Sequence, residues 1–392
     1  MNVTLVSCWF ANSYGLYSDG LRQALERKLG GEVAVVASNC GCTDPAEIRR
    51  EFQDQRCDFF VLPNLGYWKS TSPLKYSLRR AIRQVLYRAR AKRYLSHARG
   101  ADVMHFMQTL NATGFVTLYN WLRLPSTAAR VVTVHELDPH QVDQPDTNRV
   151  YNTADRIIVH AEEMKTDLVK LGVRADLIDI IEQGVAIGPL PEGPRSGILY
   201  YGGHRLTGNK GFDTLLDAMK TVKARLGAGC PRLTIYGYYG MEAPDFAVKM
   251  VAERGLTDVV LWRDWLRLPD AVKEYAQAQL LVVPFTGSFA GLPAGLALAN
   301  GVPVIGTKRA GLPEHLGPLG QWIEENDAAG LAAQIVRLLG DPAERERLAR
   351  AGRERAERVL SWDVVAEKTL RSYEAALRNK RESAGRPAAA AV

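Results

Sequence analysis

The chain has 392 residues, of which 46% are hydrophobic and 24% are charged, and its formal net charge is +7. These values are typical of a globular protein, and the length suits two domains of roughly 200 residues rather than one core. No apolar run approaches the ~20 residues of a membrane-spanning helix, so we expect none. The positive charge suggests an acidic partner.

The five cysteines are an odd number and show no paired C-x-x-C spacing. We therefore expect reduced thiols, with neither a disulfide framework nor a metal site. The first residues, MNVTLVSCWF, have the pattern of a strand rather than of a signal peptide. Together these features predict a cytoplasmic protein.

The first half of the chain alternates short apolar runs with helical patterns. Strands are predicted at residues 2–7, 32–37, 57–62, 102–107 and 130–134. Between the first two, a loop at residues 9–14 is predicted to end at Gly15, before a helix with Leu21, Leu25 and Leu29 on one face. This loop is expected at the edge of a ligand cleft, although an ordinary strand–helix connection explains it equally well.

The interval between Asp58 and Asp102 contains no acidic residue and is rich in cations. Apolar positions recur through residues 74–89 with helical spacing, which predicts a basic amphipathic helix. Such a helix suits an anionic membrane surface, where each cation contributes about 1 kcal/mol, or an acidic acceptor. A core helix with a solvated outer face is the alternative, and no nucleic-acid recognition module is present. The cations assigned to this surface are Arg79, Arg80, Arg83, Arg88, Lys92 and Arg93.

A single histidine, His135, directly follows the strand predicted at residues 130–134. That position suits a substrate contact, but a lone histidine is more often structural. Residues 151–172 read as a strand and a helix with Met164, Leu168 and Leu171 on one face, and we interpret them as scaffold.

A stretch rich in proline and glycine at residues 187–197 predicts a linker, after which a second α/β pattern begins. The strand at residues 198–201 leads into a glycine-bearing loop that contains Arg205 and Lys210 and opens a helix. A guanidinium fork and an ammonium at this spacing can converge on a diphosphate. A solvated loop is the alternative.

Residues 283–307, VPFTGSFAGLPAGLALANGVPVIGT, read as strand, glycine loop, helix and strand. The loop lies at the carboxyl end of a parallel strand, where such sheets bind ligands. The N–H groups at the helix start favour an anion by about 0.3–1 kcal/mol. A packing junction without a ligand is the alternative.

This stretch resembles the signature of the GT4-type glycosyltransferases of the GT-B fold, P-S-x-x-E-G-F-G-L-P-x-x-E-A-x-A-x-G-x-P-V. The positions in register are Pro284, Gly291, Leu292, Pro293, Ala297, Ala299, Gly301, Pro303 and Val304. The two glutamates of the family are replaced by Ser288 and Leu296.

The resemblance implies an α/β protein with two Rossmann-like domains, whose parallel sheets face each other across a cleft. Residues 1–186 would form the acceptor domain, 187–197 the linker, and 198–360 the nucleotide-sugar domain. Residues 361–379 would form a terminal helix that crosses back to the first domain, and 380–392 a disordered tail.

The activity implied by the resemblance is sugar transfer with retention and without a metal, from a UDP- or GDP-linked donor to a sugar-containing acceptor. No tightly bound cofactor and no nucleic-acid partner are implied, and a peripheral position on the inner face of the membrane fits the basic stretch. The catalytic residues would be His135, Arg205 and Lys210. The donor would contact Gly15, Gly203, Arg205, Lys210, Gly237, Arg263, Ser288, Gly291, Leu292 and Glu314.

The missing glutamates leave three hypotheses. Each lost charged hydrogen bond costs roughly 1.5–3 kcal/mol, which weakens donor affinity about ten- to hundredfold but leaves the diphosphate site intact. We favour an active transferase with an altered donor pocket. The alternatives are a catalytically silent scaffold subunit and a GT-B coupling enzyme that uses a cyclitol unit.

Overall fold

The structure is a computed structural model that describes most of the chain. The described residues are 1–7, 13–38, 57–60, 100–108, 127–135, 137, 147–190, 192–202, 206, 208–236, 245–263, 268–287, 291–309 and 311–385. The chain forms two compact units, one made of Met1–Ile181 with Val365–Val392 and the other of Glu182–Val364.

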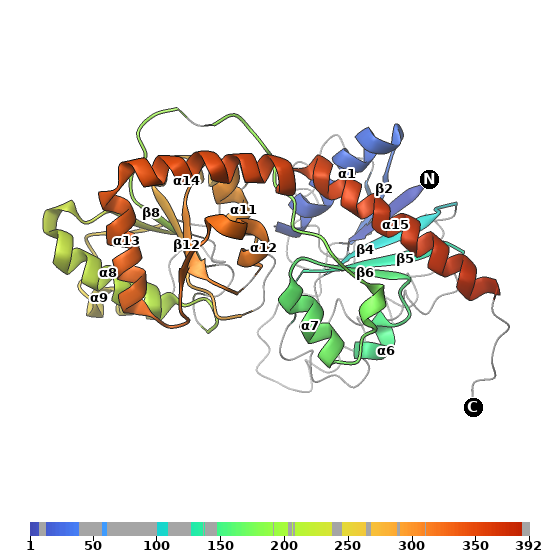
Figure 1. The fold of residues 1–392 in the computed structure, drawn as a ribbon, viewed down its shortest axis with the longest axis horizontal. Coiled ribbons are helices and arrows are strands. Elements are labelled where there is room, and N and C mark those ends of the chain that lie inside the picture. Colours follow the sequence, from blue (N-terminus) through green and yellow to red (C-terminus); the bar gives the residue numbers. More distant parts are fainter. Residues whose placement is uncertain are drawn as a thin grey trace. The chain divides into compact units, whose positions relative to one another are not determined.

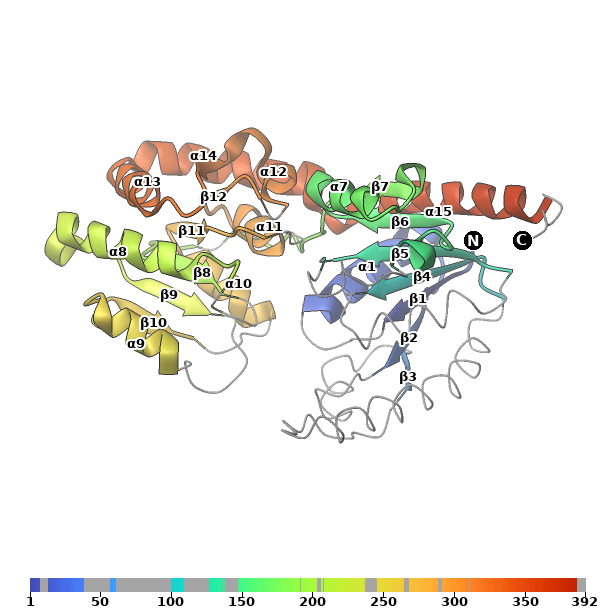
Figure 2. The same cartoon turned by 90° about the horizontal axis from the view of Figure 1, so that it is seen from below.

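The N-terminal unit is built on a seven-stranded sheet in the order β3-β2-β1-β4-β5-β6-β7, with every pairing parallel (Figures 1 and 2). Its strands are β1 (Val3–Ser7), β2 (Ala34–Ser38), β3 (Cys57–Phe60), β4 (Val103–Gln108), β5 (Ala129–Val134), β6 (Arg156–Val159) and β7 (Ile178–Ile180). Since the carboxyl ends of parallel strands share one edge, this sheet has a single edge suited to ligands.

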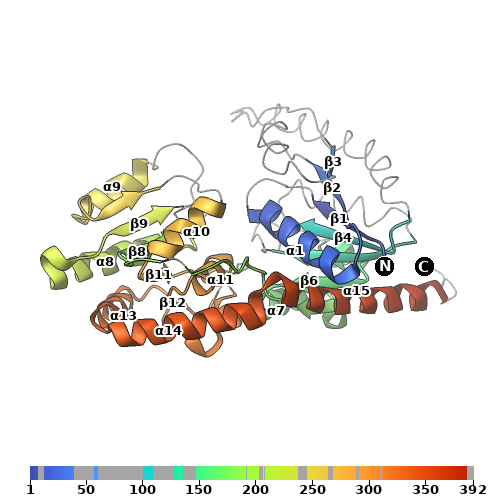
Figure 3. The same cartoon turned by 90° about the horizontal axis from the view of Figure 1, so that it is seen from above.

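Helices cover both faces of this sheet. In the described part of this unit they are α1 (Ser13–Leu29), α6 (Thr147–Tyr151), α7 (Glu162–Lys170) and α15 (Trp362–Gly385). Figures 1 and 3 show α1 and α15 over one face, and α6 and α7 over the other. Met164 and Leu168 of α7 are buried against Phe106, Val132 and other strand residues that point to the same face.

The terminal helix α15 is fixed to this sheet by polar contacts. Ser372 donates to Asp179 (2.7 Å), Asn379 donates to the carbonyl of Asp155 (2.9 Å), and the Tyr373 hydroxyl lies 2.7 Å from Nδ1 of His105. The helix continues through Gly385, so the disorder predicted from residue 380 is wrong for residues 380–385.

The second unit is built on a six-stranded parallel sheet in the order β10-β9-β8-β11-β12-β13 (Figure 2). Its strands are β8 (Ile198–Tyr201), β9 (Leu233–Tyr236), β10 (Val260–Trp262), β11 (Leu280–Val283), β12 (Val304–Thr307) and β13 (Gln321–Ile323). Its helices are α8 (Phe212–Leu226), α9 (Asp245–Glu253), α10 (Leu268–Gln277), α11 (Leu292–Ala299), α12 (Leu312–Leu316), α13 (Ala328–Gly340) and α14 (Pro342–Arg355).

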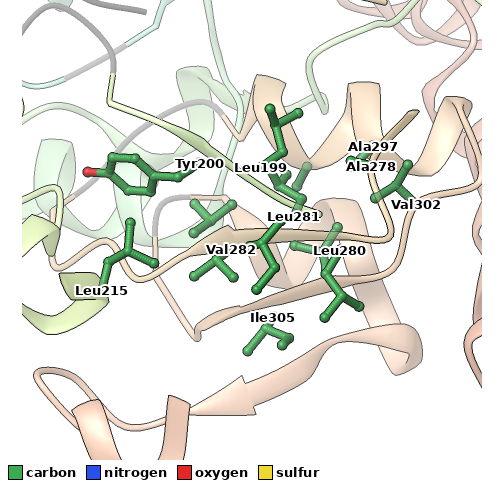
Figure 4. Close-up of a cluster of buried hydrophobic side chains, with 14 of the residues drawn as sticks. Leu199, Tyr200, Leu215, Ala278, Leu280, Leu281, Val282, Ala297, Val302 and Ile305 are labelled. Carbon is green, nitrogen blue, oxygen red and sulfur yellow. The ribbon is translucent and has the colours of Figure 1, made fainter. Parts of the chain in front are cut away.

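The helices of the second unit also form two layers. Helix α8 packs against α13, and α11 packs against α10, α12 and α14. The right-handed connections run from β8 toward β10 and from β11 toward β13, that is, in opposite directions. They therefore place these two groups of helices on opposite faces of the sheet. A sheet covered on both faces needs apolar side chains on both, which explains why all of β11 is buried. Its side chains meet those of β8, β12 and α8 in the core (Figure 4).

The predicted fold class, α/β with two parallel-sheet domains, is confirmed. The predicted strands are present with their ends moved by a few residues; the strand expected at 32–37, for example, is β2 at Ala34–Ser38. One prediction at the first loop is wrong, because α1 begins at Ser13 and Gly15 lies in its first turn. In the described ranges, no helix has both the length and the apolar composition needed to cross a membrane.

The core of the second unit should be sensitive to the loss of a single β11 side chain. Leu281→Ala removes a fully buried side chain, and we expect it to lower the free energy of unfolding by about 2–5 kcal/mol. Urea denaturation measures this change. The matched control is Leu190→Ala, at a side chain that is 48% exposed, which should stay within about 0.5 kcal/mol of the wild type.

Candidate functional site

The carboxyl ends of β8 and β11 mark the switch point of the second sheet. From β8 the chain moves outward to β9 and β10, whereas from β11 it moves the other way to β12 and β13. The two strands are direct neighbours. The connection from β8 to α8 and the connection from β11 to α11 therefore begin side by side, at the position where open α/β sheets bind ligands.

These two connections contact each other closely. The N–H of Thr286 donates to the carbonyl of Asn209 (2.9 Å). Gly211 caps the start of α8 in a left-handed conformation (φ +65°), and a Cβ there would overlap the carbonyl of Pro284. Only glycine meets both demands, so Gly211 allows α8 to begin directly beside the end of β11.

The predicted diphosphate ligand Lys210 lies at this junction. Its backbone carbonyl accepts a hydrogen bond from the Tyr200 hydroxyl (3.1 Å), which ties the loop to β8. Its ammonium nitrogen lies 4.4 Å from the centre of the Phe285 ring, and Phe285 is buried. The cation is thus held over the connection that follows β11.

Helix α11 supplies the second helix start at this edge. Its N-cap, Gly291, is left-handed (φ +76°), Pro293 stands in the first turn, and no described side chain caps the helix. A Cβ on Gly291 would lie 2.6 Å from Nδ1 of His315, a buried ring that donates to the carbonyl of Gly311 (2.8 Å). His315 therefore requires a glycine at this helix start.

The arrangement can hold an anion. Helices α8 and α11 both begin at the carboxyl edge of adjacent strands, and each presents the positive end of its dipole there. The ammonium of Lys210 adds a full charge beside them. We call this group, made of Lys210, Gly211, Gly291 and Leu292, the anion cradle.

Two further predicted donor residues, Arg263 and Glu314, lie in the described part of the second unit and make contacts of their own. Arg263 follows β10, where its side chain forms an ion pair with Glu274 (3.2 Å) and its N–H donates to the carbonyl of Ile235. Glu314 lies in α12, and its backbone carbonyl accepts from Arg355 (2.7 Å). Neither contact brings these side chains to Lys210.

Several predicted residues lie outside the described residues. These are Gly203, Arg205, Gly237 and Ser288 of the donor site, and Arg79, Arg80, Arg83, Arg88, Lys92 and Arg93 of the basic stretch. Of the two positions where the family has glutamate, Leu296 is described. It is 6% exposed and belongs to the apolar core of the second unit, so it supplies no hydrogen bond.

In the N-terminal unit, His135 directly follows β5 and is 3% exposed. Its Nδ1 lies 2.9 Å from Nε2 of His160, which follows the neighbouring strand β6. The Tyr17 ring of α1 packs edge-on against it, with 4.5 Å between ring centres. Burial and the nearby His160 and His105 lower the pKa of His135 well below its usual value, so the ring is neutral at pH 7.

A third histidine, His105, lies deeper in the same unit, on β4. Its Nε2 lies 2.6 Å from the Thr133 hydroxyl and its Nδ1 lies 2.7 Å from the Tyr373 hydroxyl. Burial and the neighbouring His160 lower the pKa of His105 to about 3. Among the described residues, no three His, Cys, Asp or Glu side chains gather so that they could hold a metal ion.

Several residues that shape these sites were not predicted from the sequence. The role of Gly211 could have been recognised, because a glycine directly before a helix that follows a parallel strand often allows two backbone segments to approach closely. His160 lies in the segment interpreted as scaffold, and Tyr17 and His315 carry no local signal. Their roles depend on which strand ends become neighbours.

The chain resembles known glycosyltransferases in both halves. Residues 17–188 match the family model described as Glycosyltransferase Family 4, and residues 195–341 match the model described as Glycosyl transferases group 1. The two matched segments contain most of the described elements of the two sheets.

Curated relatives match over parts of their length. The MMP alpha-(1->4)-mannosyltransferase of Mycolicibacterium hassiacum is 35% identical over 132 residues, which are 33% of this chain and 32% of that protein. The D-inositol 3-phosphate glycosyltransferase of Thermomonospora curvata is 28% identical over 247 residues, 56% of this chain and 57% of that protein. The chain thus spans about a third of the first relative and somewhat more than half of the second.

Solved structures share the fold over nearly the full length. S. aureus TarM, in complex with UDP and saccharide ligands, has a TM-score of 0.72 and 13% identity and covers 95% of this chain and all of its own. Sucrose-phosphate synthase from Thermosynechococcus elongatus has a TM-score of 0.70 and 20% identity, with 95% and 98% covered. Anabaena HepE with UDP and glucose has a TM-score of 0.69 and 15% identity, with 95% and 99% covered.

The close approach at Gly211 should be measurable by substitution. Gly211→Ala adds a Cβ that overlaps the Pro284 carbonyl as well as left-handed strain, and we expect a loss of about 3 kcal/mol or more in the free energy of unfolding. Gly208→Ala is the control, because Gly208 is also left-handed (φ +77°) but has open space around it. That variant should lose only about 1–2 kcal/mol. Equal losses in urea denaturation would contradict the close approach.

The buried histidines should make the fold sensitive to acid. The pKa of His105 is about 3 in the folded state and 6.5 when exposed, so between these values the unfolded chain binds the extra proton. Stability is therefore fully present above pH 6.5 and declines as the pH falls toward 3. Urea denaturation across this range should show a shallower decline in His105→Gln. The same slope in both proteins would contradict the assignment.

Proposed function

Since the chain belongs to the GT4-type glycosyltransferases of the GT-B fold, we propose that it transfers a sugar from a nucleotide-sugar donor to an acceptor. The anion cradle carries this proposal. It brings two helix starts and the Lys210 ammonium to the switch point of the second sheet, where a donor diphosphate would bind.

In this proposal the cradle stabilises the leaving group. As the bond between the sugar and the diphosphate breaks, negative charge builds up on the diphosphate oxygens. The N–H groups at the starts of α8 and α11 and the Lys210 ammonium would face that charge and would need little reorganisation during the reaction. Arg205, which belongs to the same connection, would add a bidentate contact.

The donor is proposed to be a UDP- or GDP-linked sugar. Structural neighbours were solved with UDP, one of them together with glucose, which supports the uridine nucleotide. The relatives named as a mannosyltransferase and an inositol 3-phosphate glycosyltransferase support a sugar or a sugar-like acceptor. Gly15, Gly203, Gly237, Arg263, Ser288 and Glu314 remain proposed donor contacts, and His135 a proposed contact to a sugar.

We further propose that transfer proceeds with retention and without a metal. The cradle supplies positive charge at the position where other enzymes use a metal ion. Leu296 places an apolar side chain where the family has a glutamate, so this protein would bind the donor without a hydrogen bond from that position. The membrane role of the basic stretch remains a prediction from the sequence.

Nucleotide binding tests the cradle directly. Lys210→Ala should weaken the affinity for UDP roughly ten- to hundredfold, because a charge-assisted contact contributes about 1.5–3 kcal/mol. The matched control is Lys220→Ala, at an exposed lysine on α8, the helix that follows Lys210, and it should leave the affinity unchanged. Isothermal titration calorimetry with UDP and GDP measures both variants.

The double variant Arg205→Ala with Lys210→Ala should lose nucleotide binding while its unfolding transition is retained. Slow hydrolysis of UDP- or GDP-linked sugars by the wild type would support a transferase over a silent scaffold. A wild type that binds no nucleotide, or a Lys210→Ala variant with full affinity, would refute the proposal.

A further inference from the structure

Two buried imidazoles are joined at the carboxyl edge of the N-terminal unit. His135 follows β5 and His160 follows the adjacent strand β6. Nδ1 of His135 lies 2.9 Å from Nε2 of His160, and Nδ1 of His160 lies 2.8 Å from the carbonyl oxygen of Ile181. His160 is completely buried. The three groups form a chain of hydrogen bonds that runs from the backbone after β7 to His135.

The carbonyl of Ile181 fixes which nitrogen of His160 carries the proton. A carbonyl oxygen accepts a hydrogen bond and cannot donate one, so Nδ1 of His160 must be an N–H. Because a neutral imidazole has one proton, Nε2 of His160 then carries a lone pair and accepts. His135 must fill the donor role in the second bond, so its proton lies on Nδ1.

The surroundings keep this pair neutral. Among the described residues, the titratable groups near His135 are His160, His105 and Tyr17, whose ring packs edge-on against it. Burial raises the pKa of Tyr17, so that side chain adds no negative charge that could stabilise an imidazolium. A positive charge on either ring would also be buried beside other imidazoles, which is unfavourable. Nε2 of His135 is therefore a hydrogen-bond acceptor.

His105, in the same unit, lacks such a fixed tautomer. Its two nitrogens face the hydroxyls of Thr133 and Tyr373, and each hydroxyl can either donate or accept. The proton on His105 can therefore lie on either nitrogen. His135 and His160 differ because their chain ends on a carbonyl.

We propose that His160 is a positioning residue that holds His135 in the tautomer whose Nε2 accepts a hydrogen bond from a hydroxyl of the bound sugar substrate. This inference rests on the proposed function, in which His135 contacts a sugar. It also defines the ligand atom, which must be a hydroxyl donor. A phosphate oxygen is an acceptor and would not bind to this nitrogen.

Nitrogen-15 NMR of the histidine-labelled full-length protein tests the tautomer without any substrate. Resonances are assigned with single His135→Asn and His160→Asn variants. In the wild type, Nε2 of His135 should resonate as an unprotonated nitrogen and Nδ1 as a protonated one. A proton on Nε2 of His135 overturns the inference.

Two variants of the positioning residue separate its role in orientation from its role in packing. In His160→Gln, the amide oxygen can still accept from Nδ1 of His135. In His160→Asn, the amide can still donate to Ile181, but the side chain is too short to accept from His135. The NMR signature of His135 should persist in His160→Gln and become a mixture of tautomers in His160→Asn. An unchanged signature in His160→Asn overturns the inference.

Hydrolysis of UDP-glucose, UDP-N-acetylglucosamine and GDP-mannose gives the functional measurement. For a hydrolysed donor, we expect kcat/KM to fall roughly ten- to hundredfold in His160→Asn and clearly less in His160→Gln. Urea denaturation of both variants identifies losses due to unfolding. Equal losses of kcat/KM in variants of equal stability overturn the inference. If the wild type hydrolyses none of the donors and binds no nucleotide, the proposed function fails, while NMR still decides the tautomer.

Discussion

The contact between Gly211 and the carbonyl of Pro284 determines the geometry of the second unit's edge. It allows a helix to start beside the end of a neighbouring strand with no side chain between them. Three contacts depend on this spacing. They are the hydrogen bond from Thr286 to Asn209, the hydrogen bond from Tyr200 to Lys210, and the contact of the Lys210 ammonium with the Phe285 ring. A bulkier residue would separate the two connections and disperse the positive charge that they gather.

The two units use the same architecture for different chemistry. Each is a parallel sheet with a switch point, between β1 and β4 in the first unit and between β8 and β11 in the second. The second unit supplies helix starts and an ammonium at its carboxyl edge, which suits an anion. The first unit supplies neutral imidazoles beside Tyr17, which suit uncharged polar groups. This division supports the proposed transfer from a charged donor to a hydroxyl-bearing acceptor.

Much of the fold was predictable from local sequence, whereas the site was predictable only in part. The strands of both sheets are short apolar runs because both faces are covered, and such runs are visible in the sequence, as at β11. The positions of Lys210 and Gly291 at the carboxyl edge were predictable because both lie in glycine-bearing connections between an apolar run and a helical pattern. The partnership of His135 with His160 was not, since it depends on β5 and β6 being neighbours. The contact of Tyr373 with His105 joins residues far apart in the chain, so it could not be predicted from local sequence either. Gly15 was misplaced because helix starts are poorly defined by sequence.

The terminal helix α15 has a consequence for the biogenesis of the protein. The N-terminal unit needs Val365–Gly385 to complete its packing, yet the whole second unit lies between those residues and Ile181. During translation the second unit can therefore finish folding as one uninterrupted stretch, although its synthesis starts later. Until α15 emerges from the ribosome, the nascent first unit lacks Tyr373 for His105 and leaves uncovered the sheet face on which α15 docks. That interval is when a chaperone would be of most use to this chain.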